Sequence, residues 1–367
     1  MSRGLQRALS SLVRSEPLLS ALLVITAVLA IVSRGFRCRI LELSRPNALG
    51  LLAGLMASSG LLEESGLLAR LGWEAAERGP PWGALALAEI LLGTLSAFTM
   101  NDAAILVAAP LASMIARASD SDAAVAVALM AVAVNMGSSL TPFGNPQNIL
   151  IWHDYGVPLW GFTAAMTPLV LAGFAVLAAF TYALLRGRAW RLERGPPPRV
   201  DRTGALVGVT ALALTVCLAS LGVPGAIAGL AGLASSAAYD WRVIYSVNPA
   251  VLLLIGSLFA DFTFLGGLLR GHLPAGLLRG GAPLYLLAAS LSQVVSNVPA
   301  AAMLAGLAGD WRALAYGVDV GGVLLVTGSI ANVLAVKMGR IPLRRYQKAQ
   351  LMVALPILLA GLAIIAR

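Results

Sequence analysis

Two apolar stretches of the chain are interrupted by asparagine, serine, glycine and proline residues, and these interruptions could bind an ion. The first stretch covers residues 135–150 and the second covers residues 319–334. The two match at a constant offset of 184 positions, as between 135 and 319, which pairs Gly144 with Gly328. Glycine and proline weaken a helix, and a break in a membrane helix frees backbone groups for a ligand. A repeated break of this kind is the best pointer in a sequence to the binding site of a transporter.

The most informative carboxylate is Asp102, which follows Asn101 in the middle of the apolar stretch 82–117. A carboxylate inside a membrane segment is costly, so a function is expected for it. It could bind a cation directly or carry a proton, and the alternative is that it only caps a helix after a hairpin tip. Asp319 takes the place of Asn135 in the second copy of the repeat. Asp102 and Asp319 are therefore the two candidates for proton or cation coupling.

The interrupted stretches supply oxygen and amide groups of the kind that hold small ions. Side-chain oxygens and freed carbonyls suit a hard cation, whereas the positive ends of half-helices suit an anion. The alternative is that each polar group only satisfies the broken backbone. The predicted substrate-binding residues are Thr99, Asn101, Asp102, Thr141, Gly144, Asn145, Asn148, Ser296, Asn297, Gly328, Ser329 and Asn332. The predicted Na⁺ ligands among them are Asn101, Asp102, Asn145 and Asn297.

Composition places these residues in a lipid bilayer. Of the 367 residues, 59% are hydrophobic and 12% are charged, against about 25% charged residues in soluble domains. The net charge of +9 comes from basic residues in loops beside apolar runs, so nucleic acid is not expected as a partner. Cys38 and Cys217 are the only cysteines, and with two histidines they predict neither a disulfide framework nor a zinc site. His153, beside Asp154, is expected at the membrane surface.

The order of apolar stretches repeats along the chain, and an extra helix between the repeats would turn the second one upside down. Residues 82–117 could be a re-entrant hairpin or one long helix. The predicted fold is an all-α polytopic membrane protein with inverted repeats, re-entrant hairpins and broken helices, with about nine full crossings plus two hairpins. The predicted parts are a first repeat at 1–186 (hairpin about 82–117, broken helix about 121–153), a basic loop and linker helix at 187–221, and a second repeat at 222–367 (hairpin about 283–309, broken helix about 313–336).

Basic residues favour one orientation in the membrane. Arginines within residues 1–16 and the basic loops 186–202 and 337–348 all fall in the cytoplasm if the N-terminus is cytoplasmic and the C-terminus lies outside. The basic stretch 34–45 then lies outside, which counts against this orientation.

Several of these segments resemble motifs of the ion transporter superfamily. They are residues 101–110, 140–148 and 292–299, together with residues 60–67. Members of this superfamily include arsenite-pump (ArsB) permeases, NhaD-type sodium–proton antiporters, citrate permeases and divalent anion–sodium symporters. The Gly-Asn-Pro-Gln-Asn segment that begins at Gly144 is most similar to a branch of anion permeases without an assigned substrate.

The resemblance implies a central site between two hairpin tips and two helix breaks, in a multi-pass protein of the plasma membrane of a prokaryote. It also implies a scaffold part that forms a homodimer and a transport part that moves as an elevator. The symporters carry Ser-Asn-Thr at both tips, whereas this chain has Met100-Asn101-Asp102 at one tip and Ser296-Asn297-Val298 at the other. An acid at the first tip fits proton or sodium antiport at least as well as a two-sodium dicarboxylate mechanism.

We therefore expect a secondary active transporter of a small inorganic or organic anion, coupled to Na⁺ or H⁺ and needing no other cofactor. The alternatives are a Na⁺/H⁺ antiporter, an arsenite or antimonite efflux permease, and a channel. An enzyme is not expected, and no catalytic residue is assigned: Tyr239-Asp240 resembles an aspartyl intramembrane protease only superficially, because its Gly-x-Gly-Asp partner is missing. The sequence has no Gly-x-x-x-x-Gly-Lys loop, so ATP-driven transport would need another subunit.

Overall fold

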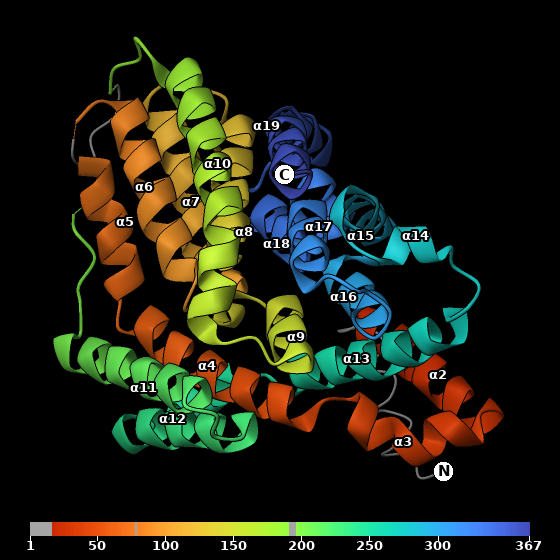
Figure 1. Ribbon diagram of the computed structural model, residues 1–367. Coiled ribbons are helices and arrows are strands. Elements are labelled where there is room, and N and C mark those ends of the chain that lie inside the picture. The colour runs from red at the N-terminus through yellow and green to blue at the C-terminus, as the bar shows by residue number, and fades with distance from the viewer. Residues whose placement is uncertain (1–16, 78, 191–195) are drawn as a thin grey trace.

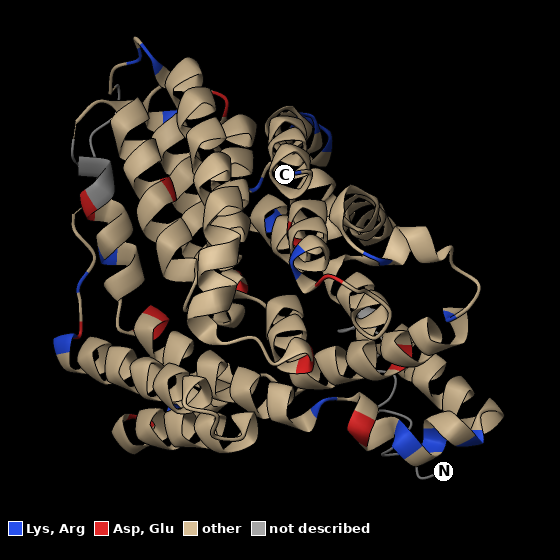
Figure 2. Cartoon of the chain, in the orientation of Figure 1, with Lys and Arg blue, Asp and Glu red and all other residues tan. Residues whose placement is uncertain are grey.

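The computed structural model describes residues 17–77, 79–190 and 196–367, which form helices and connecting turns without a strand (Figure 1). The predicted fold class, an all-α membrane protein with broken helices, is confirmed. Residues 1–16 and 191–195, which contributed to the predicted orientation, lie outside the described residues. Figure 2 shows that lysine and arginine residues lie mainly in loops and at helix ends, as expected beside a bilayer.

The first half of the chain supplies the first hairpin and the first broken helix. Ser33 caps α3 by accepting a hydrogen bond from a backbone N–H, and Pro46 and Pro146 occupy the first turns of α4 and α9. Residues 34–43 were expected to be a loop because they are basic, but they form the helix α3. The elements are α2 (Pro17–Val32), α3 (Arg34–Leu43), α4 (Pro46–Glu64), α5 (Leu67–Glu77), α6 (Pro81–Ser96), α7 (Asn101–Ala118), α8 (Ala123–Ser138), η1 (Pro142–Gly144), α9 (Pro146–Tyr155) and α10 (Leu159–Leu185).

The second half repeats this order after one helix that joins the halves. The joining helix is α11 (Arg202–Ser220), and the elements that follow are α12 (Gly225–Tyr239), η2 (Trp241–Ser246), α13 (Pro249–Leu269), α14 (Ala275–Leu278), α15 (Gly281–Val295), α16 (Asn297–Ala305), α17 (Trp311–Leu324), η3 (Val326–Gly328), α18 (Ile330–Gly339) and α19 (Leu343–Ile365). The hairpin α15–α16 corresponds to α6–α7, and α17–η3–α18 corresponds to α8–η1–α9.

Both helix breaks occur where the sequence repeat places them. A short 3₁₀ turn interrupts each crossing, and η3 begins at Val326, 184 positions after η1 begins at Pro142. The helices that follow begin at Pro146 and Ile330, again 184 positions apart. The same local structure therefore recurs at the same offset as the sequence match.

The stretch 82–117 is a helical hairpin and not one long helix. The chain leaves α6 at Ser96 and enters α7 at Asn101. In the second hairpin it leaves α15 at Val295 and enters α16 at Asn297. Asn101 and Asn297 thus have the same position, as the first residue of the second helix of each hairpin.

The two halves contact each other reciprocally. α7 packs on α18 as α16 packs on α9, and α8 packs on α19 as α17 packs on α10. An approximate two-fold axis between the halves produces this exchange of partners. The helices α8 and α17 lie at the centre and are buried on nearly every face. In Figure 1, α4, α11, α12 and α13 lie together as a layer beneath the hairpins and the broken helices.

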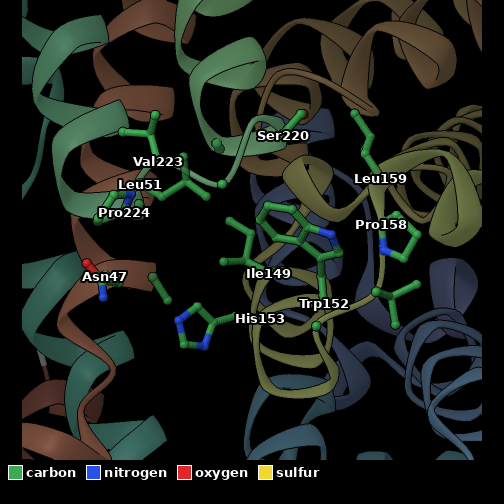
Figure 3. A pocket seen from close by; sticks show the side chains of 16 residues that line it. Asn47, Leu51, Ile149, Trp152, His153, Pro158, Leu159, Ser220, Val223 and Pro224 are labelled. Atoms are coloured by element: carbon green, nitrogen blue, oxygen red, sulfur yellow. The ribbon is translucent and has the colours of Figure 1, made fainter.

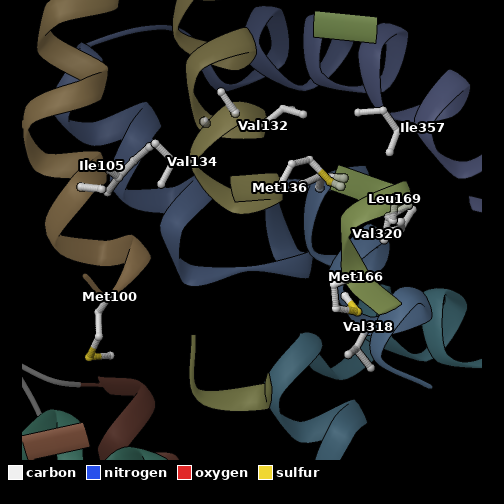
Figure 4. Packing of buried hydrophobic residues seen from close by; sticks show 14 of the residues in the cluster. Met100, Ile105, Val132, Val134, Met136, Met166, Leu169, Val318, Val320 and Ile357 are labelled. Atoms are coloured by element: carbon white, nitrogen blue, oxygen red, sulfur yellow. The ribbon is translucent and has the colours of Figure 1, made fainter. Parts of the chain in front are cut away.

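Close packing around α8 fixes the centre of the molecule. Figure 4 shows Met136 of α8 near Met166 and Leu169 of α10, within one continuous apolar cluster. A Cβ atom at Gly137 would overlap the backbone of Gly93, so glycine allows α6 and α8 to meet at backbone distance. The first break is therefore attached to a rigid helix.

Within the described residues, four helical segments are long and apolar enough to cross a bilayer. Shorter apolar helices, including both broken crossings, would supply the others, so the total of about nine crossings stays a prediction. The four segments are Leu159–Leu185, Arg202–Ser220, Trp241–Leu269 and Leu343–Ile365.

Candidate ion-binding site

A cavity of about 120 Å³ lies where four helices begin. Its polar wall comes from the first residues of α7, α9, α16 and α18 and the residues just before them, and α13 supplies an apolar wall. Backbone N–H groups at a helix start have no partner within the helix and carry partial positive charge. Within the described part of the chain, no side chain caps α7, α16 or α18. The polar wall consists of Asn101, Asp102, Gln147, Ser296, Asn297 and Ser329.

Asp102 is the acidic group of this cavity. Its side chain is partly buried, and it has no hydrogen-bond or ion-pair partner among the described residues. None of the described residues that line the cavity is arginine, lysine or histidine. The carboxylate is therefore available to a proton or a cation inside the cavity.

The second predicted carboxylate, Asp319, lies behind the cavity and is enclosed by amide groups. It is 3% exposed. The Nδ2 of Asn148 donates to Oδ2 of Asp319 at 3.0 Å, and the Nε2 of Gln147 donates to Oδ1 at 3.1 Å. The Nδ2 of Asn145 lies 3.5 Å from the same Oδ1. All three donors come from the start of α9, so a carboxylate of one half holds the helix break of the other half.

The reciprocal contact is built around Asn135, the counterpart of Asp319 on α8. Its Nδ2 donates to Oδ1 of Asn332 at 3.2 Å, and its Oδ1 accepts from the hydroxyl of Ser329 at 3.4 Å. Ser329 and Asn332 are the counterparts of Asn145 and Asn148 at the 184-residue offset. The hydrogen bonds between the two halves therefore occur twice, once around the carboxylate of Asp319 and once around the amide of Asn135.

Each hairpin tip is also tied to the break of its own half. The hydroxyl of Thr141 donates to the backbone carbonyl of Ala97 beside the first tip. The hydroxyl of Ser296 donates to the carbonyl of Gly328 at 3.2 Å at the second tip. Ser296 has a φ of 75°, a left-handed conformation that is unfavourable for a residue other than glycine.

The predicted residues therefore fall into two groups. Those that line the cavity are Asn101, Asp102, Ser296, Asn297 and Ser329. Those that lie outside its lining are Thr99, Thr141, Gly144, Asn145, Asn148, Gly328, Asn332 and Asp319. Several of the second group support the breaks: Asn145 Oδ1 accepts from the N–H of Asn148 at 2.9 Å and caps α9, and Thr99 bonds the carbonyl of Leu95. The Oδ1 of Asn148 is buried without a partner among the described residues.

Two functional positions were missed by sequence reasoning. Gln147 both lines the cavity and bonds Asp319. Gln293 joins the second hairpin to the second break, because its Nε2 donates to the carbonyl of Gly321 at 2.9 Å and its Oε1 accepts from the N–H of Leu325 at 3.1 Å. Each has an uncharged amide side chain in an otherwise apolar stretch, and this difference in polarity is the sequence signal that could have identified it.

Comparison with known proteins assigns the chain to a family. The sequence profile of the family described as citrate transporter (CitMHS) matches residues 9–310, which include both hairpins and the first break. The chain is 33% identical to the inner membrane protein YbiR of Escherichia coli over 293 residues, 78% of each chain. It is 28% identical to the uncharacterized transporter MJ0456 of Methanocaldococcus jannaschii over 253 residues, 66% of this chain and 67% of that protein.

The fold is similar to a solved transporter. The crystal structure of the YdaH transporter of Alcanivorax borkumensis superposes with a TM-score of 0.56 and 16% sequence identity, covering 95% of this chain and 96% of that one. At this identity the likeness concerns the fold alone. The profile match and the YbiR relation together show that the chain belongs to the citrate transporter (CitMHS) family and is an integral membrane transporter.

Proposed function

We propose that the protein is a secondary active transporter that moves a small inorganic or organic anion together with Na⁺ or H⁺. The observation that carries this proposal is the cavity at which four helix starts surround one unpaired carboxylate, Asp102. Each helix start is equivalent to about half a positive charge, so together they supply roughly two. This charge suits an anion even though no basic side chain is among the described residues that line the cavity.

Asp102 supplies the coupling in this proposal. An ionised carboxylate in the cavity repels an anion, so the anion binds best after Asp102 has taken up a proton or a Na⁺ ion. Binding of the cation and binding of the anion then favour each other, which is the thermodynamic requirement for coupled transport. Asn101 and Asn297 line the same cavity and are the further candidates for Na⁺ ligands, with Asn145 behind it.

Asp319 is the second coupling candidate, and its surroundings favour a fixed charge. Amide N–H groups from three residues point to its two oxygens, so its acceptor capacity is largely used. The unpaired Oδ1 of Asn148 gives this cluster one additional acceptor. We place ion exchange at Asp102 first, because its oxygens are unoccupied.

Alternating access is proposed to occur by an elevator motion. The scaffold part consists of α2–α4 and α11–α13, and the transport part consists of the hairpins, the broken helices, α10 and α19. A cavity of about 350 Å³ lies between α9 and the scaffold elements α4 and the α11–α12 turn (Figure 3). An ion pair between Arg45 and Asp154, with a distance of 2.7 Å, joins the two parts beside it. Side chains at this cavity lack close contacts, whereas elsewhere on the boundary α13 and α16 meet at backbone distance, at Gly266 and Met303.

The remaining assignments follow from the same proposal. The protein would form a homodimer through the scaffold part in the plasma membrane of a prokaryote, with inverted repeats, a cytoplasmic N-terminus and the C-terminus outside. The family description makes citrate the first organic anion to test. We also propose that the protein belongs to the branch of anion permeases that have no assigned substrate.

Transport by purified protein in proteoliposomes tests the proposal. Uptake of citrate and of inorganic oxyanions is measured under an imposed Na⁺ gradient and, separately, an imposed pH gradient. We expect one anion to accumulate under one of the two gradients, and loss of that accumulation in Asp102→Asn. No accumulation of any anion under either gradient would contradict the proposal.

A Na⁺/H⁺ antiporter is the second candidate, favoured by the presence of a carboxylate and the absence of basic side chains among the described lining residues. It predicts Na⁺-driven changes of internal pH without any added anion. Arsenite and antimonite, included among the substrates, test the efflux permease alternative in the same vesicles.

A further inference from the structure

A larger cavity of about 540 Å³ adjoins the central cavity, and Asp102 lines both. Val251, Leu254 and Ile330 also line both cavities, so the two spaces adjoin at these side chains. The other walls of the larger cavity come mainly from α4, α7 and α18. It therefore leads from Asp102 toward α4.

The side of the cavity formed by α4 carries two polar residues, Ser59 and Glu63, which are one helical turn apart and share a face. Ser59 is 1% exposed, and its hydroxyl has no partner among the described residues. A buried hydroxyl without a partner is unfavourable unless water or an ion binds it. The cavity is thus lined by a hydroxyl without a partner among the described residues, together with the carboxylates of Glu63 and Asp102.

The charge of this cavity is of one sign. Glu63 and Asp102 are its acidic residues, and no arginine, lysine or histidine is among the described residues that line it. A cleft with one sign of charge and low-dielectric walls concentrates ions of the opposite sign. The larger cavity has two acidic residues and the starts of α7 and α18, whereas the central cavity has one acidic residue and all four helix starts. This balance of charge favours cations in the larger cavity and anions in the central cavity.

We propose that the larger cavity is the access route of the coupling cation, with Glu63 as its first acceptor, Ser59 as an intermediate oxygen and Asp102 as its destination. The cation is Na⁺, or a proton carried along water molecules, and no bond other than the O–H bonds of the carried proton is made or broken. This inference rests on the proposed function, because it takes Asp102 as the coupling residue. The anion reaches the central cavity by another path.

Charge-selective labelling tests the route without depending on transport. In a background with Cys38→Ser and Cys217→Ser, the variant Ser59→Cys is treated with a cationic and an anionic methanethiosulfonate reagent of similar size. We expect the cationic reagent to react faster by about tenfold beyond the ratio found for a free thiol, because the cavity concentrates cations. Glu63→Gln should bring the ratio close to that of the free thiol.

Glu64→Gln is the matched control, because Glu64 neighbours Glu63 on α4 but is exposed and does not line the cavity. It should leave the labelling ratio unchanged. Equal rates for the two reagents, no labelling at all, or an equal effect of Glu64→Gln would overturn the proposal. If Ser59→Cys does not fold, Ser246→Cys serves as the reporter, because Ser246 also lines the cavity.

Transport provides a second readout. Glu63→Gln should raise the half-saturating cation concentration about tenfold, and at a saturating cation concentration it should leave the half-saturating anion concentration unchanged. Failure of the wild-type protein to transport any anion would contradict the proposed function but not the labelling result. Intact coupling through Asp102 combined with equal labelling rates would contradict the access route alone.

Discussion

The two halves of the molecule have the same breaks but carry their carboxylates in different places. In the first half the acid is at the hairpin tip, Asp102, and the helix before the break carries an amide, Asn135, which holds the break of the second half. In the second half the tip carries Val298 at the equivalent position, and the acid, Asp319, is on the helix before the break. One carboxylate faces a cavity without a partner among the described residues, and the other is surrounded by amide donors. Under the proposed function, the duplicated scaffold thus separates an exchangeable charge from a fixed one.

The largest expected effect is the loss of coupling in Asp102→Asn. The amide keeps the shape of the side chain but can neither take up a proton nor neutralise a cation. The ratio of anion uptake with and without the cation gradient should fall by about 5–150-fold, the span of a typical coupling free energy. Uptake assays in proteoliposomes measure this ratio. An unchanged ratio would remove Asp102 from the coupling role.

Asp319→Asn should mainly affect folding rather than exchange. Its new amide nitrogen would face donors that now point to a carboxylate oxygen, so at least one buried hydrogen bond to a charged group is lost. The expected loss of stability is about 2 kcal/mol, measured as a lower thermal unfolding midpoint in detergent. Asp102→Asn should show a much smaller shift in the same assay, and equal shifts would contradict the division into fixed and exchangeable charges.

The exchange variant Asn135→Asp with Asp319→Asn tests whether the two sites are equivalent. It moves the carboxylate to the first half, where the hydroxyl of Ser329 and the Nδ2 of Asn101, 3.3 Å from Asn135 Oδ1, can donate to it. Its second oxygen, however, replaces the Nδ2 that donates to Oδ1 of Asn332 and to the carbonyl of Ala131, so we expect the double variant to be no more stable than Asp319→Asn. The thermal midpoints of the single and double variants measure the difference, and a double variant more stable than Asp319→Asn would show that the halves are interchangeable.

A smaller difference is expected between the two bonds that tie each hairpin tip to its break. Thr141 is almost fully buried, so Thr141→Ala leaves the Ala97 carbonyl unpaired in an apolar setting, at about 1–2 kcal/mol. Ser296 is only partly buried, and Ser296→Ala should reduce stability by less than about 1 kcal/mol. Thermal unfolding of both variants gives the comparison. Ser296→Gly, which relieves the left-handed backbone, should be more stable than Ser296→Ala.

The smallest effect is expected at the boundary between the scaffold part and the transport part. Asp154 pairs with Arg45 in the first half, whereas the equivalent residue of the second half is Met338. Asp154→Asn should change thermal stability by about 1 kcal/mol or less, as is usual for ion pairs near a surface. Its effect should appear instead in the rate of transport, and Met338→Leu is the matched control without an effect on either.

The sequence was sufficient for the elements that are repeated and insufficient for those that depend on how the halves pack. The two breaks and two hairpin tips could be predicted because Gly144 and Gly328, and Asn101 and Asn297, recur at constant offsets. Gln147 was missed because its counterpart is Ala331, so a search for repeated polar residues passes over it. The bonds to Asp319 join residues about 170 positions apart (from 148 to 319), and no local pattern encodes that contact.

The helix α3 shows a different reason for a wrong prediction. Its arginines were taken to indicate a loop, but Phe36 and Leu43 lie on one face and are buried, while arginines occupy the exposed side. Spacing along the helix mattered more than charge in deciding the structure of this segment.

The convergence of four helix starts at one cavity affects how substitutions can change the ion that such proteins transport. Under the proposed function, peptide groups at the helix starts provide most of the attraction for the anion, and a point mutation replaces a side chain without deleting the peptide group. Substitutions around the pocket can therefore alter its size and its preference among oxyanions or carboxylic acids while the basal affinity for negative charge persists. A transporter built in this way can therefore come to carry a different nutrient or toxic ion through a few substitutions, each of which leaves a folded protein that still binds anions.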